Sequence, residues 1–68
     1  MTRSEKENWL CNIQNTANAV AGGENGSEKV RFVLQEFGGG ATSIERLSPI
    51  YYESVWNELF DLEREMKD

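Results

Sequence analysis

Residues 48–66, SPIYYESVWNELFDLEREM, carry the clearest structural signal in the chain. Ser48 suits a helix N-cap, and Pro49 suits the first helical position, where its missing N–H leaves no hydrogen bond unmade. Apolar side chains then recur three and four residues apart. At about 100° per residue they fill roughly half of a helix circumference. These side chains are Tyr51, Tyr52, Val55, Trp56, Leu59, Phe60, Leu62 and Met66.

The width of this apolar face predicts how the helix packs. A single neighbouring helix covers a narrower stripe, roughly 100° wide. We therefore expect this helix to lie against two other helices at once, with the alternative that its Trp56 and Phe60 edge contacts another chain. The opposite half is polar and predicted to face water; it holds Glu53, Ser54, Asn57, Asp61, Arg64, Glu65 and Asp68.

Residues 4–21 predict a first helix. Trp9, Ile13, Thr16, Ala17 and Val20 recur at helical spacing. Thr2 with Glu5, and Ser4 with Glu7, both fit a capping box, so two starting registers are open. The asparagines at positions 8, 12, 15 and 18 are poor helix formers, so this helix needs support from tertiary packing.

Residues 27–37 predict a second helix. Val30, Val33, Leu34 and Phe37 follow the i, i+3, i+4, i+7 rule. Asn25 or Ser27 can cap its start. Gly38 is expected to take the left-handed conformation that closes a helix.

Residues 43–47 predict a single turn, of α or 3₁₀ type. Thr42 and Glu45 match a capping box, and Ile44 and Leu47 are expected to point inward. Together these segments predict an all-α fold, a compact three-helix bundle with one additional short helical turn, as a single helical domain over residues 1–68. Its predicted core is Trp9, Ile13, Val20, Val30, Val33, Leu34, Phe37, Ile44, Leu47, Tyr52, Val55, Leu59 and Leu62.

The composition narrows the function classes. Twelve acidic residues against seven basic ones argue against nucleic acid or an anionic membrane as the direct partner. With one cysteine and no histidine, the chain can form neither an internal disulfide nor an ordinary zinc site. A lone thiol fits a reducing compartment, and the charged residues 1–7 do not resemble a signal peptide. We expect a cytoplasmic protein without metal, cofactor or membrane contact.

Candidate catalytic groups are sparse, and we expect no enzymatic activity, catalytic residue or cofactor site. Glu58 and Asp61 lie one turn apart on the predicted last helix, and carboxylates placed in this way usually belong to a solvated surface. Cys11 lies on the polar side of its helix, and Lys6 is the only cation even loosely placed to activate it, so it is interpreted as an inert thiol. The glycines at positions 38–40 lack the lysine of a phosphate-binding loop and are interpreted as a flexible link.

Four aromatic residues are the candidates for contact with a protein partner. Phe32 lies opposite the apolar face of its helix, so it is either covered by the first helix or the N-terminal tail, or left open as an interface anchor. Tyr51, Trp56 and Phe60 lie at the edges of the last apolar face, with burial in the core as the alternative. The predicted partner is another protein or a second copy of the chain.

One pattern spans residues 30–62, about half of the chain. It reads Val30-x-x-Val33-Leu34-x-x-Phe37-Gly38, Ser43-Ile44-Glu45-x-Leu47-Ser48-Pro49-x-x-Tyr52-x-x-Val55, and then Leu59 and Leu62. It resembles a helical segment of small uncharacterised proteins of bacterial phages and conjugative elements, and also the tails attached to phage single-strand annealing proteins. The resemblance implies a mobile genetic element as the source and an accessory role. It consists of core and capping residues, so it implies no catalytic residue.

The predicted function is therefore a non-enzymatic protein-interaction or accessory module encoded by a mobile genetic element. Two alternatives stay open: a nucleic-acid-associated accessory domain in the DNA processing of such an element, and an acidic inhibitor that mimics DNA.

Overall fold

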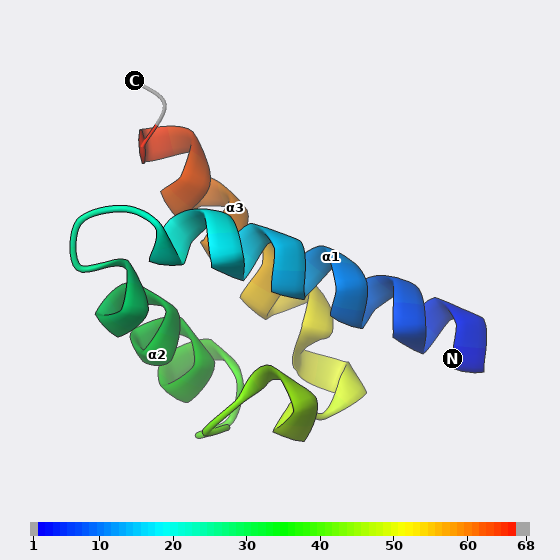
Figure 1. The fold of residues 1–68 in the computed structure, drawn as a ribbon. Coiled ribbons are helices and arrows are strands. Elements are labelled where there is room, and N and C mark those ends of the chain that lie inside the picture. Colours follow the sequence, from blue (N-terminus) through cyan, green and yellow to red (C-terminus); the bar gives the residue numbers. More distant parts are fainter. Residues whose placement is uncertain (1, 67–68) are drawn as a thin grey trace.

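The computed structural model describes residues 2–66 and contains three α-helices and two 3₁₀ segments. The helices are α1 (Arg3–Ala21), α2 (Gly26–Phe37) and α3 (Tyr52–Met66). The 3₁₀ segments η1 (Ile44–Arg46) and η2 (Pro49–Tyr51) lie in the connection between α2 and α3 (Figure 1). The all-α three-helix bundle is confirmed, with two short turns in place of the one predicted.

The last helix packs against both of the others. In Figure 1, α3 passes behind α1, and α2 lies beside them after a tight turn at the end of α1. α3 contacts α1 along most of the interface and α2 along the rest. This arrangement confirms that the wide apolar face of α3 is shared between two neighbours.

The start of α1 selects one of the two predicted capping registers. Thr2 is the N-cap, and its Oγ1 accepts a hydrogen bond from the Glu5 N–H at 3.2 Å. The same hydroxyl lies 3.2 Å from Oε1 of Glu5. Glu7 instead forms an exposed ion pair with Arg3, Nε to Oε1 3.3 Å, so the Ser4 register is not used.

The end of α2 differs from the prediction by one residue. Gly38 has φ −110° and still donates its N–H to the Leu34 carbonyl at 3.1 Å, so it continues the helical hydrogen bonding. Gly39, with φ +68°, takes the left-handed position instead. Gly40 then donates to the Gln35 carbonyl at 3.1 Å, which is the closing bond of a Schellman motif.

The connection to α3 also corrects two details. The turn predicted for residues 43–47 is the 3₁₀ segment η1, but Ser43 and not Thr42 is its N-cap, and no side-chain capping bond forms. A short 3₁₀ turn closes with backbone i→i+3 bonds, here Leu47 N–H to the Ile44 carbonyl at 3.1 Å. Ser48 is an N-cap and Pro49 the first helical residue, as predicted, but they open the 3₁₀ segment η2 without a side-chain capping bond, and the α-helix begins only at Tyr52.

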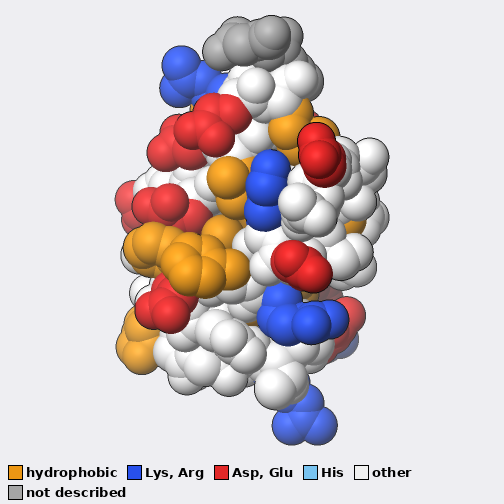
Figure 2. Space-filling view, turned by 90° about the vertical axis from the view of Figure 1, so that its left-hand side faces the viewer, with side chains coloured by type: hydrophobic (Ala, Val, Ile, Leu, Met, Phe, Trp, Pro, Cys, Tyr) orange, Lys and Arg blue, Asp and Glu red, His pale blue; other side chains and the backbone are white. Residues whose placement is uncertain are grey.

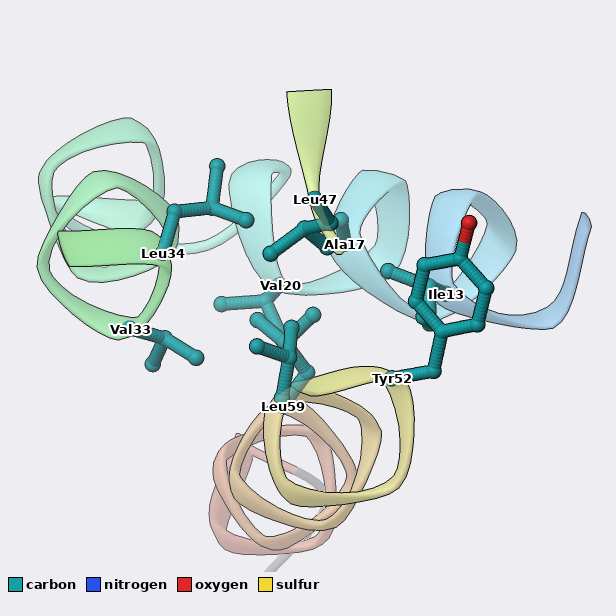
Figure 3. Close-up of a cluster of buried hydrophobic side chains, with 9 residues drawn as sticks. Ile13, Ala17, Val20, Val33, Leu34, Leu47, Tyr52 and Leu59 are labelled. Atoms are coloured by element: carbon teal, nitrogen blue, oxygen red, sulfur yellow. The ribbon is translucent and has the colours of Figure 1, made fainter. Parts of the chain in front are cut away.

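All three helices and the η1–η2 connection contribute side chains to one buried cluster. Figure 3 shows these side chains pointing toward a common centre between the helices. Its members are Ile13, Ala17, Val20, Val33, Leu34, Leu47, Tyr52, Val55 and Leu59. Thr16 is the buried polar residue beside it. The cluster holds the three helices together by removing apolar surface from water.

Several predicted core residues lie at the margin of this cluster. Trp9, Val30, Ile44 and Leu62 are only partly buried and pack against it. Phe37 was predicted to be core and is instead 37% exposed, because it is the last residue of α2 and no further turn of that helix flanks it. Met66 is exposed too, although its side chain lies against Gly23. Asp68, predicted for the polar face, lies outside the described residues.

Candidate protein-interaction surface

Three aromatic rings from α1 and α3 form a continuous surface, which we call the aromatic ledge. Trp9 and Trp56 meet edge to face, with ring centroids 6.3 Å apart and an interplanar angle of 74°. Trp56 and Phe60 stack, with centroids 5.0 Å apart and an angle of 18°. Edge-to-face and offset-stacked rings are the favoured aromatic arrangements. These contacts fix the ledge across both helices.

The position of the ledge follows from the core. Val55 and Leu59 are fully buried, so the residues that follow each of them, Trp56 and Phe60, lie at the edge of the apolar face of α3. Trp56 and Phe60 are four residues apart and so lie one above the other. The two tryptophans are half-buried, whereas Phe60 is 37% exposed. The two tryptophan rings of the ledge thus pack against the core, while the Phe60 ring is in contact with water.

Charged side chains border the ledge along α3. The Arg64 guanidinium carbon lies 5.9 Å from the centroid of the Phe60 ring, a cation–π geometry. Glu53 precedes Trp56 by one turn, and the half-buried Glu63 follows Phe60 by one turn. In the described part of α3, Arg64 is accompanied by Glu53, Glu58, Asp61, Glu63 and Glu65. The rim of the ledge on α3 is therefore acidic.

A small open hollow adjoins the ledge at Trp9. It has a volume of about 170 Å³ and is lined by Glu5, Asn8, Trp9 and Asn12. Pockets that bury a small molecule usually measure roughly 300–1,000 Å³ and are mostly apolar. This hollow is smaller and lined largely by exposed polar side chains, so it extends a contact surface and does not form an enclosed ligand site.

Phe32 lies away from the core on α2 and is open. It is 56% exposed, so neither α1 nor the N-terminal residues that the structure describes cover it. Figure 2 shows the face that lies to the left in Figure 1, where α2 is found. On that face apolar side chains gather in a compact patch with acidic side chains above and below it. The open alternative for Phe32 is the one observed.

Tyr51 is not part of the ledge. It is the half-buried last residue of η2, and a Cβ built on Gly39 would lie 2.6 Å from its Cε2 atom. Tyr51 thus packs against Gly39, one of the three glycines at positions 38–40 that we call the glycine connection. The four predicted contact residues therefore fall in three places, and only Trp56 and Phe60 come together. Trp9 completes their surface, although the sequence pattern assigned it to the core.

The glycine connection borders a second open hollow, of about 340 Å³. It is lined by Gly38, Gly39, Gly40, Ala41, Thr42, Arg46, Ser48 and Tyr51. The amides of Gly38 and Gly40 already donate to carbonyls of α2, so they are not free to bind a phosphate. We therefore interpret this hollow as a consequence of the glycine-rich C-terminal end of α2 and not as a ligand site.

The reactive groups considered in the sequence are dispersed. Cys11 is exposed, and its Sγ lies 3.7 Å from Nδ2 of Asn15. Within residues 2–66, no three Cys, Asp or Glu side chains are grouped so that they could hold a metal ion. No helix in that same range has both the length and the apolar character needed to cross a membrane.

Comparison of the chain with protein-family models, curated proteins and solved structures found no match.

Proposed function

We propose that this protein is a non-enzymatic interaction module that binds another protein through the aromatic ledge. The observation that carries the proposal is the exposed Phe60 ring stacked on Trp56, which is itself held by Trp9. Interfaces draw most of their binding energy from a few residues of this kind, above all aromatic ones and arginine. The resemblance of residues 30–62 to proteins of phages and conjugative elements supports an accessory role in a mobile genetic element.

The ring contacts support this proposal because they lower the entropic cost of binding. Ordering a free side chain at an interface costs about 0.5–1.5 kcal/mol. Trp56 is already held between Trp9 and Phe60, and its neighbours Val55 and Leu59 are fully buried. The rings are therefore already ordered in the free protein, so little side-chain entropy is lost when a partner binds.

Phe32 supports a second contact point on a different helix. It is the most exposed aromatic residue in the described chain, at 56%. It stands on α2, apart from the ring contacts of the ledge, so it is tested separately from Phe60.

Site-specific photo-crosslinking in the source cell tests the proposal. A photoreactive phenylalanine analogue would replace Phe60, Phe32 or, as a control, Gln14, which is exposed on α1. We expect position 60 to give a discrete crosslinked protein that position 14 does not give. Crosslinks from position 32 alone would move the binding surface to α2. Identical products from positions 60 and 14, or none from positions 60 and 32, would contradict the proposal.

A further inference from the structure

We infer that the partner element that covers the aromatic ledge is a basic amphipathic helix; this inference rests on the proposed function. Its apolar side chains would pack on Trp56 and Phe60, and its lysine or arginine side chains would lie beside the carboxylates of α3.

The geometry of the ledge favours a helix. The centroids of Trp56 and Phe60 are 5.0 Å apart, close to the pitch of an α-helix at about 5.4 Å. Apolar side chains one turn apart on a partner helix therefore match the two rings. Addition of a partner strand requires a sheet edge with unpaired backbone groups, and residues 2–66 form no strand.

The charge around the ledge favours a basic partner. Glu53 lies one turn before Trp56, and Glu63 lies one turn after Phe60, so carboxylates border both ends of the ring pair on α3. On α1, Glu5 lines the hollow beside Trp9, and Lys6 lies one turn before the same ring. Like charges placed opposite these carboxylates would oppose binding, whereas lysine or arginine would speed encounter and fix the register.

Arg64, one turn after Phe60 on the same helix, already places a cation over the exposed ring. Its guanidinium carbon lies 5.9 Å from the centroid of Phe60, and the residue is exposed. An arginine or lysine of the partner can take the same place. A second copy of this chain would bring the same acidic α3 against the first, so the whole-chain charge of −5 disfavours it.

Tryptophan fluorescence gives a direct reading of this surface. The chain has two tryptophans, and both belong to the ledge. The probes are two synthetic helix-forming peptides with the same leucine stripe, one with lysine and arginine and the other with glutamate at all remaining positions. We expect the basic peptide to move the emission to shorter wavelength as water leaves the rings. It should bind about tenfold more tightly than the acidic peptide, because several exposed ion pairs contribute together.

Charge variants separate this inference from simple hydrophobic adhesion. Glu53→Gln should weaken binding of the basic peptide by about twofold to fivefold. Arg64→Gln should strengthen it by a similar factor, because it removes a competing cation from the Phe60 ring. Lys29→Gln, a change of an exposed residue on α2, is the matched control and should leave the affinity unchanged.

Three results would overturn the inference. They are equal binding of the two peptides, no change of emission with either, and an emission change that depends on the concentration of the protein alone, which would assign the ledge to a second copy. A discrete crosslink from position 60 would still support protein binding in each of these cases, so failure of the charge inference is distinguishable from failure of the proposed function.

Discussion

Gly26, the first residue of α2, lies directly against the backbone at the end of α1. A Cβ at this position would lie 2.1 Å from the carbonyl oxygen of Val20 and 2.6 Å from the carbonyl carbon of Ala21. Both are backbone atoms, so a small side-chain movement cannot relieve the overlap. Only glycine allows the tight turn that places α2 beside α1.

Gly26→Ala should therefore destabilise the fold strongly. We expect a loss of about 2–3 kcal/mol in the free energy of unfolding, as for other overpacked sites. That is most of the roughly 3–5 kcal/mol available to a domain of this size. Urea unfolding followed by far-ultraviolet circular dichroism measures it. Gly22→Ala is the control, because the nearest atom to its Cβ would be 3.6 Å away, an ordinary contact. Equal losses in the two variants would contradict this account.

Leu59 is the second residue with a specific expectation. It is fully buried at the centre of the core, between the two neighbours of α3. Leu59→Ala should cost about 2–5 kcal/mol, the range for buried leucines. Ile50→Ala should change stability by less than about 0.5 kcal/mol, since Ile50 is 79% exposed. Comparable unfolding midpoints for the two variants would show that the core lies elsewhere.

Among the elements, α1 contains four asparagines, at positions 8, 12, 15 and 18, which are poor helix formers. The asparagines at positions 12 and 18 are exposed, so no buried contact offsets their poor helix propensity. Asn12→Ala combined with Asn18→Ala should stabilise the fold by about 1 kcal/mol. The melting temperature should rise by about 4–8 °C, as measured by circular dichroism. A lower melting temperature would mean that these amides make contacts important to the fold.

The spacing of apolar residues predicted where the helices lie, but it predicted the residues at which they end less accurately. The repeats in 27–37 and 48–66 place α2 and α3, because one-sided apolar periodicity requires a helix with a buried face. The choice of Gly39 over Gly38 for the left-handed position depends on where helical hydrogen bonding stops. Any of three consecutive glycines can take that conformation, so the sequence alone does not distinguish them.

The candidate site was predictable in part, for a similar reason. Trp56 and Phe60 were predicted as an edge because their place on the helix circumference follows from residue number alone. Their contact with Trp9 depends on how α1 crosses α3, and no local pattern encodes that crossing. The helical spacing placed Phe32 opposite the apolar face of its helix, but whether it is exposed depends on which other elements lie near it.

At the scale of the whole molecule, the charge distribution sets what the surface can bind. Seven basic residues are spread among twelve acidic ones, and α3 presents mainly carboxylates. We expect no binding to single-stranded or double-stranded DNA even at low salt, measured by fluorescence anisotropy of labelled oligonucleotides. Binding that weakens steeply as salt is raised would contradict this and favour the nucleic-acid alternative.

The proposed surface depends on one arrangement, in which three helices enclose one core and hold the rings of Trp9, Trp56 and Phe60 together at its edge. Nuclear Overhauser effects measured by NMR test it most directly, together with backbone chemical shifts. We expect cross-peaks between the Trp9 and Trp56 rings and between the Trp56 and Phe60 rings, with helical shifts throughout residues 3–21, 26–37 and 52–66. Extended-strand shifts in 28–37 or 52–66, or the absence of contacts between the two tryptophan rings, would contradict it.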